Sequence, residues 1–151
     1  MSSYTTVLVG TDGSPSSFRA VTRAAEVAEG MKATLLIVTA YRALAGKELK
    51  AAVEELGSEA YKVTGSTPAE AVLEGAADVA RGAGATKVEL LAVEGDAVDV
   101  LADTAAARKI DLLVVGNRGL NSLAGRLLGS VPQNISHRSP CDVLIVHTTG
   151  K

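Results

Sequence analysis

Two turns in the sequence combine glycine with charged residues, and each follows a short apolar run. The first, residues 10–14 (GTDGS), carries the carboxylate of Asp12. The second, residues 116–130, holds four glycines and two arginines. Glycine lets the backbone approach a ligand closely, and arginine suits bidentate contacts to phosphate. The two turns therefore predict a binding site for a small phosphate-containing anion.

The second turn opens into an expected helix at Ser130, with Gln133 three residues on in the pattern of a capping box. Free N–H groups at a helix N-terminus bind anions, and Arg118 and Arg126 can add positive charge. The alternative is that residues 116–130 are only a long loop, whose glycines give the backbone conformational freedom, and that this loop binds no ligand. Residues 125–130 (GRLLGS) lack the lysine of a Walker A loop, and no G-x-G-x-x-G follows the first strand.

Apolar runs alternate with helical patterns along the whole chain, which predicts an α/β domain with a mainly parallel sheet and strands buried on both faces. We expect one domain over residues 1–151. In the first helix, Ser14 is the expected N-cap and Gly30 the expected end. Residues 41–67 carry no interpretable motif, although 47–56 could form a helix. The expected strands are 6–11, 33–40, 87–93, 111–115 and 142–147, and the expected helices start near residues 15, 47, 68, 97 and 130.

Composition excludes several classes of protein. A net charge of −2, three tyrosines, one phenylalanine and no tryptophan argue against a nucleic-acid partner. The single cysteine, Cys141, cannot form an internal disulfide and is expected to be a small buried apolar residue. The sequence shows no secretory signal and no apolar run long enough to span a membrane. We therefore expect a cytoplasmic protein without a membrane partner.

The spacing Gly116-x2-Gly119-x9-Gly129-Ser130 matches the nucleotide-binding signature of universal stress proteins. The VGTDGS start of the first turn and the apolar strand at 143–146 also resemble that family, over about residues 4–147. The resemblance implies an open, doubly wound, five-stranded parallel sheet of order 3-2-1-4-5, with helices on both faces, as in the adenine-nucleotide α-hydrolase-like group. Both turns would then flank one crevice.

In that family, ATP or a related adenine nucleotide, including AMP or cyclic AMP, occupies the crevice. The resemblance implies that the second turn and the following helix hold the ribose and phosphates, and that the end of the second strand lies against adenine. Asp12 would contact the ribose hydroxyls or help to hold Mg²⁺, and Gly10 would keep the floor of the pocket open. The implied nucleotide-binding residues are Gly10, Thr11, Asp12, Val38, Ala40, Gly116, Arg118, Gly119, Arg126, Gly129, Ser130 and Val131.

Three functions remain open at this point: a nucleotide-binding regulatory or stress-response module, a weak ATP hydrolase or adenylating enzyme, and a ligand-free dimeric scaffold. The sequence offers no dedicated catalytic base, which favours binding. Asp12 has the alternative role of a helix-capping carboxylate. His147 lies too far along the chain from the glycine turn to be given a role. The resemblance also implies a homodimer that pairs the last strand, residues 142–147, across a two-fold axis.

Overall fold

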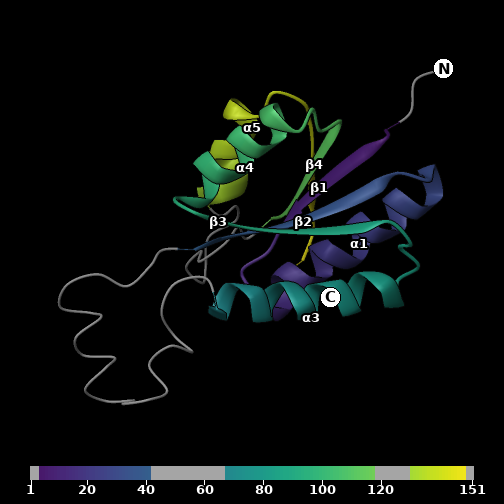
Figure 1. Cartoon of the computed structure of the whole chain (residues 1–151). Helices are drawn as coiled ribbons and strands as arrows, with labels where there is room; N and C mark the ends of the chain where they lie inside the picture. Colours follow the sequence, from purple (N-terminus) through teal and green to yellow (C-terminus); the bar gives the residue numbers. More distant parts are fainter. Residues whose placement is uncertain (1–3, 42–66, 118–129, 149–151) are drawn as a thin grey trace, which may run out of the picture.

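Five strands form one parallel sheet in a computed structural model that describes residues 4–41, 67–117 and 130–148. The order is β3-β2-β1-β4-β5, as the family resemblance implied (Figure 1). The candidate helix at residues 47–56 lies outside the described residues. The strands are β1 (Thr6–Gly10), β2 (Thr34–Tyr41), β3 (Val88–Glu94), β4 (Leu112–Gly116) and β5 (Asp142–Val146).

Helices cover both faces of the sheet. α1 (Pro15–Met31) and α3 (Thr67–Gly82) lie against one face, and α4 (Ala97–Ala107) and α5 (Ser130–Arg138) lie against the other (Figure 1). Helices on both faces of a parallel sheet confirm the predicted doubly wound α/β architecture.

None of the helices in the described ranges has the length and apolar character that crossing a membrane requires.

The strand sequences show how one chain fills two cores. Val7 and Val9 of β1 pack with α1 and α3, whereas Leu8 between them packs with α4 and α5. Successive side chains in a strand point to opposite faces, so a strand covered on both sides must be apolar throughout. β1, β2 and β4 follow this rule, and the prediction that they are buried on both faces is confirmed.

β3 departs from the predicted burial. It stands at the edge of the sheet, and Leu90 is 39% exposed, with Glu89 and Glu94 also exposed. An edge strand has a neighbouring strand on one side only, and charged residues there discourage pairing with other chains.

The end of α1 also differs from the prediction. The helix continues past Gly30 to Met31, and Lys32 takes the left-handed conformation at φ 57°. The N–H of Lys32 bonds to the carbonyls of Ala28 and Glu29, which closes the last turn without glycine.

Asp111 ties the start of β4 to the start of β1. One carboxylate oxygen, Oδ2, accepts hydrogen bonds from the Thr5 N–H at 2.8 Å, the Thr5 hydroxyl at 2.7 Å and the Thr6 N–H at 3.1 Å. These bonds, led by that from the Thr5 hydroxyl, hold the pKa of Asp111 below its usual value of 3.8. The carboxylate therefore stabilises the fold above that usual pKa, and the contribution is lost as the pH falls through the lower, folded-state pKa.

We predict that Asp111→Asn lowers the free energy of unfolding at pH 7 by about 0.5–1 kcal/mol, a modest value because solvent screens this exposed group. The deficit should shrink as the pH is lowered from 7 to an acidic value well below the usual Asp pKa of 3.8, because protonation then removes the charge of the wild-type carboxylate. Urea denaturation at both pH values measures this. An equal deficit at both would show that charge plays no part in the contact.

Candidate functional site

The two predicted turns meet because their strands are neighbours. β1 pairs with β4 in the register Val7↔Leu112 and Val9↔Val114. Gly10 and Gly116 are therefore the last residues of two neighbouring strands, at the carboxyl end of the sheet. β2 lies on the other side of β1. Strand order reverses between β1 and β4, and ligands bind outside the carboxyl ends of strands at such a point.

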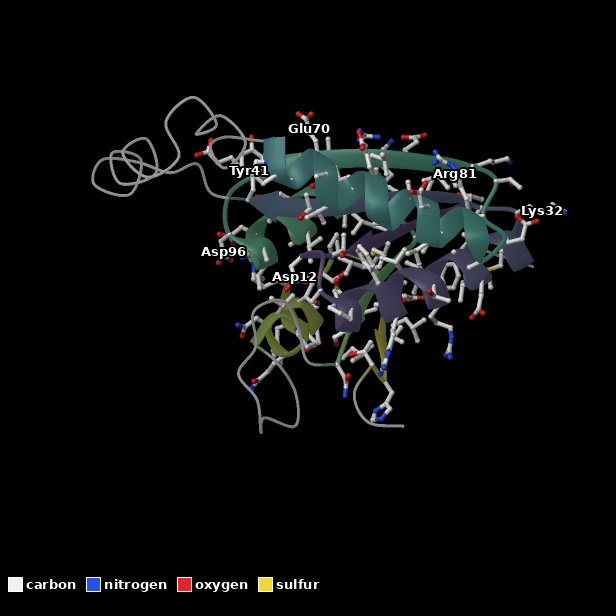
Figure 2. The ribbon with its side chains drawn as sticks, turned by 90° about the horizontal axis from the view of Figure 1, so that it is seen from below. Asp12, Lys32, Tyr41, Glu70, Arg81 and Asp96 are labelled. Carbon is white, nitrogen blue, oxygen red and sulfur yellow. The ribbon has the colours of Figure 1, made fainter. Side chains whose placement is uncertain are left out.

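Figure 2 shows the polarity of the sheet directly. Asp12, Tyr41 and Asp96, which follow or end β1, β2 and β3, lie at one end of the molecule, and Lys32 and Arg81 lie at the other. α5 connects two parallel strands, β4 and β5, and therefore runs back along the sheet from the carboxyl end. Its N-terminus is thus on the same side as Asp12.

Thr11 is fully buried and fixes the turn after β1. Its N–H donates to the Val38 carbonyl at 3.0 Å. Its hydroxyl oxygen accepts from the Gly13 N–H at 3.1 Å and shares a hydrogen bond with the Ser17 hydroxyl at 2.7 Å. The N–H and the hydroxyl of Thr11 are thus engaged inside the protein. Thr11 shapes the site by holding the turn in place.

Asp12 stands at the half-buried beginning of α1. Its Oδ1 accepts from the Ser14 N–H at 2.9 Å. Ser14 is the N-cap of α1, as predicted, and its side chain accepts from the Ser17 N–H at 3.1 Å. The cap of α1 is therefore Ser14, and Asp12, considered from the sequence as a helix-capping carboxylate, instead closes the turn just before the helix. This contact also holds its carboxylate at the edge of the sheet where the ligand is expected.

The end of β2 presents two different residues. Val38 is fully buried, with its side chain in the core beneath α4 and its carbonyl bonded to Thr11. Ala40 is half-buried and packs against the rim of the same core. Ala40 is therefore the more open of the two predicted adenine contacts.

The expected open floor at Gly10 is filled. A Cβ placed on Gly10 would lie 3.0 Å from Cδ1 and 3.1 Å from Cδ2 of Leu101, a residue of α4 that is 1% exposed. The missing side chain at Gly10 makes room for the core packing of Leu101. The sequence interpretation was wrong here because it assigned that space to a ligand.

We predict that Gly10→Ala lowers the free energy of unfolding by about 1–3 kcal/mol, because the buried Leu101 side chain must shift within a packed core to admit the added methyl group. The matched control is Gly30→Ala in α1, where an added Cβ meets nothing within 4 Å. Alanine is the better helix former by about 0.5–1 kcal/mol, so this control should be stabilised. Urea denaturation of both variants checks the pair. Equal effects at the two positions would contradict the packing role.

The chain after β5 reaches the site, which the sequence did not reveal. A Cβ on Gly116 would lie 3.0 Å from Cγ2 of Thr148, and the Asn117 side chain lies 3.5 Å from Nδ1 of His147. The dismissal of His147 by chain distance was therefore wrong. β4 and β5 pair in parallel with Gly116↔Val146, so residues following the two strands are brought together. The strand order implied by the family resemblance already placed β5 beside β4, and this could have predicted that His147 and Thr148 lie near the end of β4.

Part of the predicted site cannot be placed: Arg118, Gly119, Arg126 and Gly129 lie outside the described residues. Ser130 is the first residue of α5, and Val131 is 5% exposed, with its side chain in the core against β4. Pro132 has no N–H, so the first-turn donors come from Ser130, Val131 and Gln133. These main-chain groups lie at the N-terminal end of α5, the kind of helix end at which anions bind in proteins.

Among the described residues, the groups with clearly shifted pKa values lie at the other end of the sheet. Hydrogen bonding to Asp142 raises the pKa of Tyr4, and burial raises the pKa of the Cys141 thiol. Asp111 and Arg138 also belong to this set. All four precede the start of a strand. These shifts therefore belong to the structural end of the fold and do not mark the candidate site.

Comparison with known proteins agrees with this architecture. The model of the universal stress protein family matches residues 3–147. The universal stress protein Rv1636 of Mycobacterium tuberculosis is 54% identical over 149 residues, covering 99% of this chain and all of that protein. Its crystal structure aligns with a TM-score of 0.61 at 46% identity, over 99% of each chain.

A second solved structure is a universal stress protein in complex with cAMP. It aligns with a TM-score of 0.76 at 47% identity and covers 98% of this chain and 100% of that one. Sequence and structure agree over nearly the full length. The chain therefore belongs to the universal stress protein family.

Proposed function

We propose that this protein binds an adenine nucleotide at the carboxyl ends of β1 and β4 and acts as a stress-response or regulatory module. One observation carries the proposal. The Asp12 turn and the Gly116 end of β4 adjoin at the point where strand order reverses, in a chain 47% identical to a universal stress protein solved with cAMP.

The chemistry of the site suits a nucleotide. The N–H groups of Ser130, Val131 and Gln133 would bind phosphate oxygens, because the start of a helix carries a partial positive charge. Glycines 119 and 129 of the motif would allow the phosphates to come close to the main chain. Arg118 and Arg126 would offset the phosphate charge. The ribose would lie toward Asp12, and adenine toward Ala40.

The Asp12 carboxylate would also provide a ligand for a magnesium ion that binds together with ATP. Mg²⁺ is commonly held by one or two carboxylates together with substrate phosphates and waters. In the described ranges, no group of three histidine, cysteine, aspartate or glutamate side chains is arranged to hold a metal. A single carboxylate such as that of Asp12 suits a metal whose other ligands are phosphates and waters. We propose ATP as the default ligand, with AMP and cyclic AMP as the alternatives.

Thermal denaturation with ATP, AMP and cyclic AMP, with and without magnesium, tests the proposal. A ligand at 100 times its dissociation constant stabilises the fold by about 2.7 kcal/mol, which raises the melting temperature by several degrees. GTP serves as the control for base selection. Unchanged melting with all three adenine nucleotides would contradict the proposal and favour a ligand-free scaffold.

Gln133→Glu separates binding from stability. Gln133 is exposed in the first turn of α5, so a negative charge there should strengthen the helix by a few tenths of a kcal/mol. The same charge should repel the ligand phosphates and weaken binding by about ten-fold. Denaturation and titration of the variant should therefore move in opposite directions. Unchanged affinity would place the phosphates away from α5.

We also propose that the protein is a homodimer paired through β5. β5 is the edge strand next to β4, and the half-buried residues Val143, Leu144 and Ile145 lie along it. An apolar edge strand is prone to pair with another strand. A second copy of the chain would satisfy that edge.

A further inference from the structure

Thr148, two residues after β5, is held in place by contacts with other elements. Thr148 is 2% exposed, although it lies outside any strand or helix. Its N–H donates to Oδ1 of Asn117 at 2.8 Å, and its carbonyl accepts from Nη1 of Arg19 at 2.7 Å.

The hydroxyl of Thr148 joins two elements. It lies 3.0 Å from Oδ1 of Asn117 and 2.7 Å from the hydroxyl of Ser16 in α1. An amide oxygen only accepts hydrogen bonds, so the Thr148 hydroxyl donates to Asn117 and accepts from Ser16. Its methyl group occupies the space left by Gly116, 3.0 Å from where a Cβ would stand. Both branches of the threonine side chain are thus engaged.

Asn117 connects this contact to the glycine motif. It is the first of the two variable residues between Gly116 and Gly119. Its N–H donates to the Val146 carbonyl at 2.7 Å, which extends the pairing of β4 with β5. Its side chain receives two hydrogen bonds from Thr148. The direction in which the main chain leaves β4 is therefore fixed by the segment after β5.

We propose that Thr148 is a positioning residue of the nucleotide site. Through Asn117 it sets the main chain at Gly116 and Asn117, and through Ser16 it links that point to the first turn of α1, beside Asp12. The inference rests on the proposed nucleotide-binding function. It adds that affinity depends on a hydroxyl outside the glycine motif, in the C-terminal segment.

Titration with cyclic AMP and with ATP tests this on three variants of the full-length protein. Thr148→Val keeps the shape of the side chain and removes the hydroxyl, so the affinity for nucleotide should fall about three- to ten-fold. Thr148→Ser keeps the hydroxyl and should stay within about two-fold of wild type. Thr104→Val is the matched control, because Thr104 is 8% exposed in α4 and lies outside the site.

A second route avoids any change in the packing of Thr148. Ser16→Ala removes the hydrogen bond to Thr148 from α1 and should weaken binding in the same direction as Thr148→Val. Wild-type affinity in both Thr148→Val and Ser16→Ala would overturn the positioning role alone. An equal loss of nucleotide affinity in Thr148→Val and Thr104→Val would show that the effect comes from a general loss of stability, and this would also overturn the positioning role. A wild-type protein that binds neither nucleotide would overturn the proposed function, and the positioning role with it.

Discussion

Replacing Gly119 with valine is expected to abolish nucleotide binding while the melting temperature stays nearly unchanged. Gly119 is the second glycine of the motif and lies outside the described residues, so the prediction comes from the motif. Phosphates bound by main-chain N–H groups need a close approach that a β-branched side chain blocks. The affinity should fall by more than about 100-fold, equivalent to about 2.7 kcal/mol.

Isothermal titration and circular dichroism of the same preparation check this result. Gly82→Val is the matched control, because a Cβ at this exposed glycine of α3 meets nothing within 4 Å. The control should bind nucleotide as the wild type does. Retained affinity in Gly119→Val would mean that the turn after β4 is not the phosphate-binding segment.

Leu144→Lys is expected to convert the proposed dimer to a monomer. Leu144 is half-buried at the centre of β5, the edge strand proposed to pair with a second copy. A lysine on each partner would place two positive charges close together across a two-fold axis and remove apolar contact area. Light scattering should then report half the wild-type mass, with an unchanged circular dichroism spectrum.

The opposite edge of the sheet supplies the control. Leu90 lies on β3 and is 39% exposed, so Leu90→Lys adds the same charge to the other edge strand. That variant should remain a dimer. If Leu90→Lys were the monomeric variant, the interface would lie at β3 and the proposed pairing of β5 would be wrong.

The order of the strands was predictable only through the family resemblance, whereas their positions followed from the residues. β1, β2 and β4 are buried on both faces, and such strands appear in sequence as continuous apolar runs. The exposure of β3 had only a weak signal in the sequence. Residues 90–93 (LLAV) are as apolar as the central strands, and only the charges of Glu89 and Glu94, which the central strands lack, indicated an edge position.

Features of the site that depend on residues close in sequence could be predicted, whereas contacts between distant parts of the chain could not. Ser14 followed by Pro15 predicted the start of α1, because capping depends on residues within one turn. The filling of the space above Gly10 by Leu101, and the contact of Thr148 with Asn117, depend on elements distant in sequence. Only the packing of α4 and the pairing of β4 with β5 bring those side chains together.

Isothermal titration of the purified wild-type protein with cyclic AMP, AMP and ATP, with and without magnesium, tests the central claim most directly. We predict saturable binding of at least one of these nucleotides, with one site per chain. A magnesium requirement for ATP would indicate a triphosphate ligand, whereas a preference for cyclic AMP or AMP would indicate a sensor of the monophosphate. No heat of binding with any of the three would contradict an adenine-nucleotide site at the ends of β1 and β4.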